Sequence, residues 1–169
     1  MLKKPWVDLD LVKAPKAQRL PDIVTVDQVR QLLAATRVRS YHVLFFTLYS
    51  LGLRLGEGLR LQVGDIDADR QRVHVRNAKG NKDRLVPLPG ATLVQLRAFW
   101  RLHQHPKFLF PNRHGGLAAA ATAKSPLDRG GVQKTLKQVV ADCRIKKRSH
   151  HTACATAMPP ICWKPASIC

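Results

Sequence analysis

The chain has 169 residues, and its 29 Lys and Arg against 11 Asp and Glu give a formal net charge of +18 and an isoelectric point near 10.7. Its 45% hydrophobic content fits one globular domain with a buried core and excludes a disordered polycation. Such an excess of positive charge favours a polyanionic partner, so nucleic acid is the first candidate, and on charge alone a ribosomal-type or membrane-surface protein stays open. The sequence shows neither an apolar run of membrane-spanning length nor a signal peptide, so we expect no membrane association and a cytoplasmic, bacterial nucleoid-associated protein.

The first elements in chain order are a linker and two helices. Residues 1–22 are basic and punctuated by proline, without helical or strand periodicity, which is typical of a linker remnant. Thr25 and Gln28 have capping-box spacing and predict a helix that runs to about Arg37. The nearly all-apolar stretch 41–50 is too long for a strand and predicts a buried helix that ends at Gly52.

A third helix and a small antiparallel sheet are expected next. Arg54 lies at or just before the start of the third helix, with Leu55, Leu59 and Leu61 on its inner side. Residues 72–76 alternate with a period of two and predict a strand that pairs with residues 84–88 across a turn containing Gly80 and Asn81. Residues 63–67 are a candidate third strand.

Two more helices follow, separated by a long connection. Apolar residues recur at helical spacing from Leu93 to His103, and again from Val132 to Val140. Residues 106–129 are rich in Pro, Gly and Ala and predict an irregular connection, for which Phe108, Leu109 and Phe110 are the apolar anchor.

Three short motifs resemble the tyrosine recombinase family, which comprises the phage integrases and the Xer-type site-specific recombinases. They are Gly-Leu-Arg-x-x-Glu (52–57), Lys-Gly-Asn-Lys-Asp-Arg-x-Val-Pro-Leu-Pro (79–89) and Phe-Leu-Phe-Pro (108–111), and the resemblance covers roughly Pro15 to Thr152. It implies a mainly α-helical catalytic domain with a small antiparallel β-sheet (α+β), here residues 23–152 and incomplete at its C-terminus. The implied partner is double-stranded DNA, with other recombinase protomers as a further partner.

The chemistry that the resemblance implies is transesterification of a DNA phosphodiester by a tyrosine hydroxyl, and it requires no metal or cofactor. Arg54 matches the first catalytic arginine, whose planar guanidinium donates two hydrogen bonds to a phosphate without losing its charge. Glu57 matches the acidic residue that holds the guanidinium or a neighbouring histidine in place.

Lys79 matches the turn-borne lysine that protonates the leaving 5′-oxygen in the family. Lys82 competes for this assignment, and we treat Lys82, Arg76 and Arg84 as DNA-binding groups that neutralise backbone phosphates.

The second family motif is His-x-x-Arg, and its histidine position is occupied by His151. Cys154 stands where the second arginine belongs, and a thiol supplies neither a permanent positive charge nor a two-pronged donor. The two tyrosines, Tyr41 and Tyr49, precede Arg54 in apolar helical context, so we expect them in or near the core and expect no nucleophile in this chain.

The tail, residues 153–169, has no helical period, and we interpret it as aberrant. Codons permitted for it, read from each third base, can spell Leu-Arg-His-Arg-Tyr-Ala-Thr-His-Leu-Leu-Glu-Ala-Gly-Val-Asp-Leu, the kind of segment that the family places after His-Thr. We therefore infer a frameshift between Thr152 and Cys154. The nucleotide sequence from the Arg148 codon onward tests this inference, which fails if the alternative frame stops at once.

The leading hypothesis is a truncated, catalytically dead recombinase or transposon integrase, a pseudogene fragment of a transposable element. One alternative is a non-enzymatic basic DNA-binding protein or a competitor of an intact recombinase. Another is a chain too damaged to fold. A metal site at His150, His151 and the tail cysteines lacks paired ligand spacing, so we expect none.

Overall fold

The structure is a computed structural model, and it describes residues 24–76, 82–116 and 118–145. The predicted linker remnant (1–22) and tail (153–169) lie outside these residues. The elements, in chain order, are α1 (Val26–Ala35), α2 (Arg39–Leu51), α3 (Leu55–Arg60), the 3₁₀ helix η1 (Val63–Asp65), β1 (Ile66–Asp67), β2 (Arg72–Val75), β3 (Arg84–Pro87), α4 (Gly90–His103), the 3₁₀ helix η2 (Ala118–Thr122) and α5 (Arg129–Asp142). A mainly helical domain with a three-stranded antiparallel sheet confirms the predicted fold class.

The first helix begins as the capping box predicts. The Thr25 hydroxyl accepts from the Gln28 N–H at 3.4 Å, and the Gln28 side chain accepts from the Thr25 N–H at 3.0 Å. The helix ends at Ala35, slightly before the expected Arg37, because Thr36 leaves the helical conformation and its hydroxyl donates to the Leu32 carbonyl.

The second helix ends at a left-handed glycine, which sets the direction of the chain toward Arg54. Gly52 has φ +59°, a backbone conformation that residues with a Cβ rarely adopt, and its N–H donates to the Leu48 carbonyl. The N–H of Leu53 donates to the same carbonyl at 3.1 Å, and the Leu53 side chain is buried. The turn therefore buries Leu53 and leaves the next residue, Arg54, at the surface.

The sheet has the strand order β1-β2-β3, with both pairs antiparallel. Val73 faces Val86 in the register, and Val73 and Val75 are buried on the inner face of β2. The predicted strands at 72–76 and 84–88 are confirmed within one residue. The candidate strand at 63–67 is confirmed only at its end, because residues 63–65 form the 3₁₀ turn η1.

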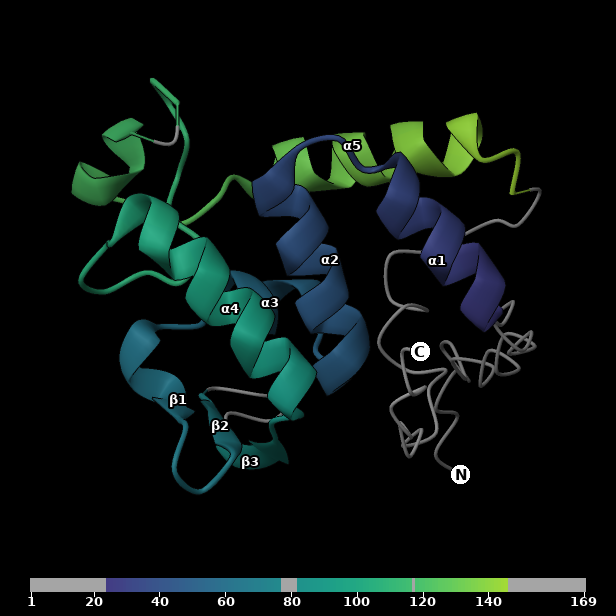
Figure 1. Cartoon of the computed structure of the whole chain (residues 1–169). Coiled ribbons are helices and arrows are strands. Elements are labelled where there is room, and N and C mark those ends of the chain that lie inside the picture. The colour runs from purple at the N-terminus through teal and green to yellow at the C-terminus, as the bar shows by residue number, and fades with distance from the viewer. Residues whose placement is uncertain (1–23, 77–81, 117, 146–169) are drawn as a thin grey trace, which may run out of the picture.

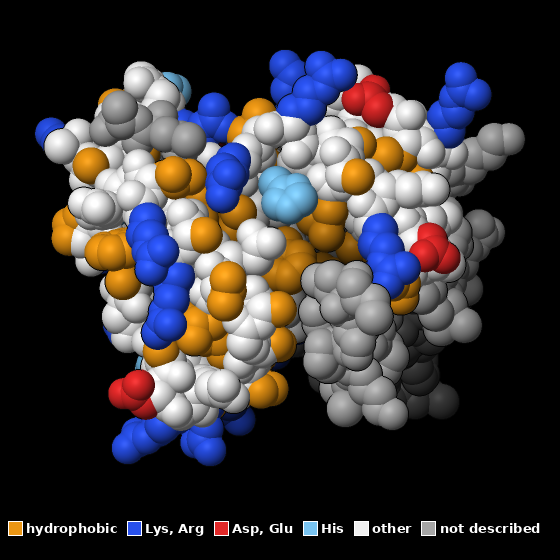
Figure 2. Space-filling model, in the orientation of Figure 1, with side chains coloured by type: hydrophobic (Ala, Val, Ile, Leu, Met, Phe, Trp, Pro, Cys, Tyr) orange, Lys and Arg blue, Asp and Glu red, His pale blue; other side chains and the backbone are white. Residues whose placement is uncertain are grey.

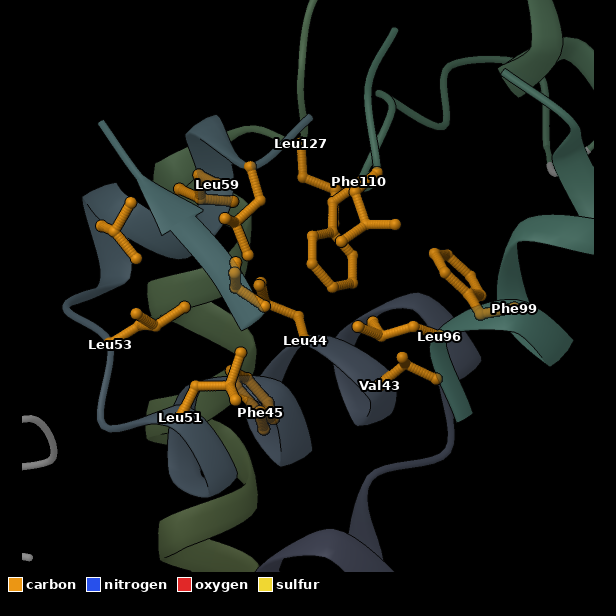
Figure 3. Close-up of a cluster of buried hydrophobic side chains, with 14 of the residues drawn as sticks. Val43, Leu44, Phe45, Leu51, Leu53, Leu59, Leu96, Phe99, Phe110 and Leu127 are labelled. Carbon is orange, nitrogen blue, oxygen red and sulfur yellow. The ribbon is translucent and has the colours of Figure 1, made fainter. Parts of the chain in front are cut away.

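The core lies where α2, α4 and β2 meet the connection between α4 and α5. Figure 3 shows Leu44 and Val43 of α2 facing Leu96 and Phe99 of α4, with Phe110 beside them. The Phe99 and Phe110 rings stack at a centroid distance of 5.7 Å. In Figure 1 the sheet lies at the bottom of the molecule and α5 at the top, where α5 contacts α1 and α3.

The irregular connection after α4 is held by backbone hydrogen bonds to distant segments. The Val63 N–H donates to the Lys107 carbonyl at 3.0 Å, and the Leu127 N–H donates to the Phe110 carbonyl at 2.9 Å. Leu109 and Phe110 are buried, as the apolar anchor predicted, whereas Phe108 is half-buried.

Two histidines fasten the end of α4 to this connection. His103 is buried, and its Nδ1 accepts from the His105 N–H at 3.1 Å. His105 Nδ1 accepts from the N–H groups of Lys107 and Phe108, so its Nε2 donates to the Ala123 carbonyl. Burial lowers the pKa of His103 and the neighbouring His105 lowers it further, while the smallest of the three contributions, from the Leu109 backbone, raises it.

The lowered pKa of His103 predicts that acid destabilises the domain. The unfolded chain binds a proton at His103 near pH 6.5, whereas the folded chain binds it only at lower pH, so stability is full above pH 6.5 and falls below it. The slope from this one group is at most about 1.4 kcal/mol per pH unit. Urea unfolding of wild type and His103→Gln between pH 7.5 and 5 measures it, and a wild-type slope no steeper than that of the variant would contradict the prediction.

Candidate nucleic-acid interface

Arg54 caps the N-terminus of the short helix α3 and carries its guanidinium at the surface. The residue has an extended backbone, with φ −69° and ψ 152°, and its carbonyl accepts the first N–H groups of the helix, those of Glu57 and Gly58, at 3.0 Å. Its side chain is 44% exposed, so part of the guanidinium is open to a ligand in solution. This placement agrees with the expectation that Arg54 lies just before a helix.

Glu57 is the buried acidic residue that holds Arg54. Its side chain is only 3% exposed; one carboxylate oxygen, Oε1, accepts from Arg54 Nη1 at 3.1 Å, and the other, Oε2, accepts from the Arg54 backbone N–H at 2.8 Å. The carboxylate therefore fixes both the backbone and the side chain of Arg54. A guanidinium held in this way has little rotational freedom left to lose when it binds an anion.

Arg84, at the start of β3, reaches the same carboxylate from the sheet. Its Nη2 donates to Glu57 Oε2 at 2.9 Å, and its side chain is 41% exposed. Two half-exposed guanidinium groups thus share one buried carboxylate, and the cluster of Arg54, Glu57 and Arg84 keeps a net charge of +1.

A second buried carboxylate lies at the same end of the sheet, where β2 ends beside the start of β3. Arg76, directly after β2, places its Nη2 2.6 Å from Asp65 Oδ1, an ion pair not aligned as a hydrogen bond, while Asp65 Oδ2 accepts from the Gln62 N–H at 2.9 Å. Asp65 is a site residue that had no predicted role from the sequence. The three-residue spacing of Gln62 and Asp65, which resembles a capping box, was the available signal.

The remaining candidate residues are only partly described. Lys82 is exposed and precedes β3 by two residues. Lys79 and His151 lie outside the described residues, so the structure brings together Arg54, Glu57 and Arg84 but says nothing of these two.

A pocket of about 370 Å³ adjoins this cluster on the sheet. His74 on β2 contacts Asp83 at 3.0 Å across its rim, between side chains that are 40% and 51% exposed. The pocket is lined by Gly64, Asp65, Asp67, Arg70, Arg72, His74, Asp83, Arg84 and Leu85. Because these residues carry charges of both signs, the pocket by itself does not select an anion.

The surface is basic beyond the cluster. Figure 2 shows Lys and Arg side chains spread over one face of the molecule, with few acidic groups among them. Within residues 24–76, 82–116 and 118–145, no group of three or more His, Cys, Asp or Glu side chains is placed to hold a metal ion. The helices of that same part of the chain are all too short or too polar to cross a bilayer.

The mainly helical domain with its small antiparallel sheet has the fold of solved recombinase structures. The chain aligns with the crystal structure of XerA recombinase with a TM-score of 0.65 at 19% identity, over 88% of this chain and 52% of that one. It aligns with XerH site-specific recombinase bound to its difH substrate with a TM-score of 0.62 at 16% identity, over 83% of this chain and 42% of that one.

The chain belongs to the phage integrase family, whose model matches residues 22–158. It is 36% identical over 116 residues to the integrase/recombinase y4qK of Sinorhizobium fredii, covering 68% of this chain and 38% of that protein. It is 38% identical over 96 residues to the tyrosine recombinase XerA of Thermococcus kodakarensis, covering 54% of this chain and 34% of that protein. The chain thus spans less than half the length of these relatives.

Proposed function

We propose that this chain is the DNA-binding catalytic region of a site-specific recombinase, and that Arg54 binds a phosphate of duplex DNA. The observation that carries the proposal is the half-exposed Arg54 guanidinium, held in place by the buried Glu57 carboxylate. Membership of the phage integrase family and the +18 charge of the chain support it. A nucleoid location follows from the same proposal.

The chemistry of the cluster suits a phosphate better than a neutral ligand. Glu57 neutralises one of the two guanidinium groups, so one positive charge remains for an anion. The N–H groups of Arg54 that do not face Glu57 can donate to two phosphate oxygens in the planar fork geometry that arginine offers. Because Glu57 is buried, it does not itself present its charge to the DNA.

Replacing Arg54 with alanine should weaken binding to a duplex of about 30 base pairs roughly tenfold or more, because even one of its hydrogen bonds to a charged phosphate contributes about 1.5–3 kcal/mol. Fluorescence anisotropy at several salt concentrations measures the loss and the accompanying decrease of about 0.9 in the salt slope. The matched control is Arg30→Ala, which removes an equal charge from an α1 side chain that is 73% exposed and paired with Asp27. Equal losses in the two variants would show nonspecific charge attraction and contradict the proposal.

We further propose that these 169 residues bind DNA without cleaving it. Cys154 stands at the position of the second arginine in the family pattern, so the phosphate would be held by one catalytic arginine rather than two. The surroundings of the two tyrosines support this proposal: Tyr41 packs against the core and its hydroxyl lies against Gly131 at the start of α5, and Tyr49 is half-buried.

The covalent step is tested in the same DNA preparation. A nicked duplex that carries the cleavage site of a full-length integrase from the same family traps phosphotyrosyl adducts, and that integrase serves as the positive control. We expect no slow-migrating protein–DNA adduct from this chain. An adduct that maps to Tyr41 or Tyr49 would overturn the proposal of a non-cleaving chain while leaving DNA binding intact.

A further inference from the structure

The two arginines on either side of the connection between β2 and β3 each form an ion pair with a buried carboxylate. Arg76 follows β2 and contacts Asp65, whereas Arg84 begins β3 and contacts Glu57. Each carboxylate is 3% exposed at its side chain, and each also accepts the backbone N–H of the residue three positions before it. The repetition indicates that these two arginines attach the sheet to α3 and η1.

We infer that Arg84 is a positioning residue for Arg54, and that it acts through Glu57. The inference deepens the proposed function and rests on it, since it concerns how Arg54 is kept available for a phosphate. It assigns Arg84 a role within the protein in place of a separate DNA contact.

The geometry at Glu57 gives the physical reason. Arginine and carboxylate groups favour a two-pronged pairing, in which two N–H groups meet both oxygens. Here Arg54 Nη1 meets only Oε1, because Oε2 already accepts from Arg84 Nη2 and from the Arg54 backbone N–H. Arg84 thereby prevents the Arg54 guanidinium from turning both prongs onto Glu57.

Removal of Arg84 would free Oε2 for the Arg54 side chain. Arg54 would then pair with Glu57 through both prongs, and the N–H groups that bind phosphate in the wild type would face the carboxylate. DNA affinity would fall although Arg54 is still present. In a chain that already lacks the Arg54 side chain, the loss of Arg84 should have little further effect on DNA affinity, because there is no Arg54 guanidinium left to reorient.

A double-mutant cycle in DNA affinity tests this coupling. Arg84→Ala alone should weaken binding about fivefold and, in the Arg54→Ala background, less than about twofold, because interacting sites are not additive. The matched control is Arg72→Ala on β2, which removes an exposed charge whose side chain makes no ion pair in the part of the chain that the structure describes. Its effect should be equal in both backgrounds. Arg84→Lys, which retains a charge beside Oε2, should recover most of the affinity and provides a second variant if Arg84→Ala does not fold.

The outcomes separate this inference from the proposed function. If Arg84→Ala weakens binding equally in both backgrounds, with a salt slope that falls by about 0.9 as for a direct phosphate contact, the positioning role is wrong and the proposed function stands. If Arg54→Ala itself leaves affinity unchanged, the proposed function fails first.

Discussion

Replacing Phe110 with alanine should destabilise the domain by about 3–5 kcal/mol, the usual cost of emptying the site of a buried aromatic ring. Phe110 is fully buried, its ring stacks on Phe99, and its carbonyl accepts from the Leu127 N–H. The ring joins the connection after α4 to the helical core (Figure 3), so its loss leaves a cavity lined by α2 and α4. Since small domains have a free energy of unfolding of about 5–15 kcal/mol, this substitution should remove a large part of the stability. Urea unfolding followed by circular dichroism measures the loss.

The matched control for Phe110 is its neighbour Phe108. This ring is half-buried and lies against the His105 ring at a centroid distance of 5.0 Å. Phe108→Ala should therefore cost about 1–2 kcal/mol, since only part of its apolar area leaves water on folding. Similar losses in the two variants would mean that the buried position of Phe110 does not govern its contribution. A cooperative transition in the wild type would also argue against a chain too damaged to fold.

The helices could be predicted from the sequence because each carries its own local signals. The capping box at Thr25 and the left-handed Gly52 are short-range features, and they set the start of α1 and the end of α2. The strand β2 could be predicted from its alternation, and β3 as its partner across a turn that contains Gly80 and Asn81. The signals of these elements lie within a few residues of one another, so no tertiary contact was needed to find them.

The connection between α4 and α5 could not be predicted in the same way. Its backbone is ordered by partners far away in the sequence, such as Leu61 for Leu109 and Ser125 for Asn112. Pro111 and Pro126 form an isolated bridge, and Phe108 forms another with Gln62. No periodicity in the sequence predicts pairings of this kind, because each pairing depends on the fold that brings the two segments together.

The candidate site also contains one contact that could be predicted from the sequence and one that could not. Arg54 and Glu57 are three residues apart, so their ion pair follows from helix geometry and could be expected from the sequence. Arg84 is 27 residues from Glu57, and its contact depends on how β3 packs beside α3. The sequence offered Arg84 only as a basic residue beside a lysine-bearing turn, and the structure adds the carboxylate that it shares with Arg54.

Glu57→Gln should reduce stability by about 1–3 kcal/mol, because it removes the charge from a buried group that holds two guanidinium groups. The lower end reflects that Arg54 and Arg84 are themselves 44% and 41% exposed, so water compensates part of the loss. The glutamine amide also directs N–H donors at groups that only donate. DNA binding should weaken as well, since Arg54 loses the partner that fixes it. Thermal unfolding and anisotropy on the same protein preparation measure both effects.

Asp27→Asn is the matched control for Glu57→Gln, because Asp27 and Arg30 form an ion pair with the same three-residue spacing at 3.3 Å. The two side chains are 82% and 73% exposed, so this pair should contribute less than about 0.5 kcal/mol and should vanish at high salt. The Glu57 effect should persist at 0.5 M salt, since a buried carboxylate is poorly screened. If both losses are equal, or if both disappear with salt, burial of Glu57 does not stabilise the cluster, and the fixed orientation of Arg54 needs another explanation.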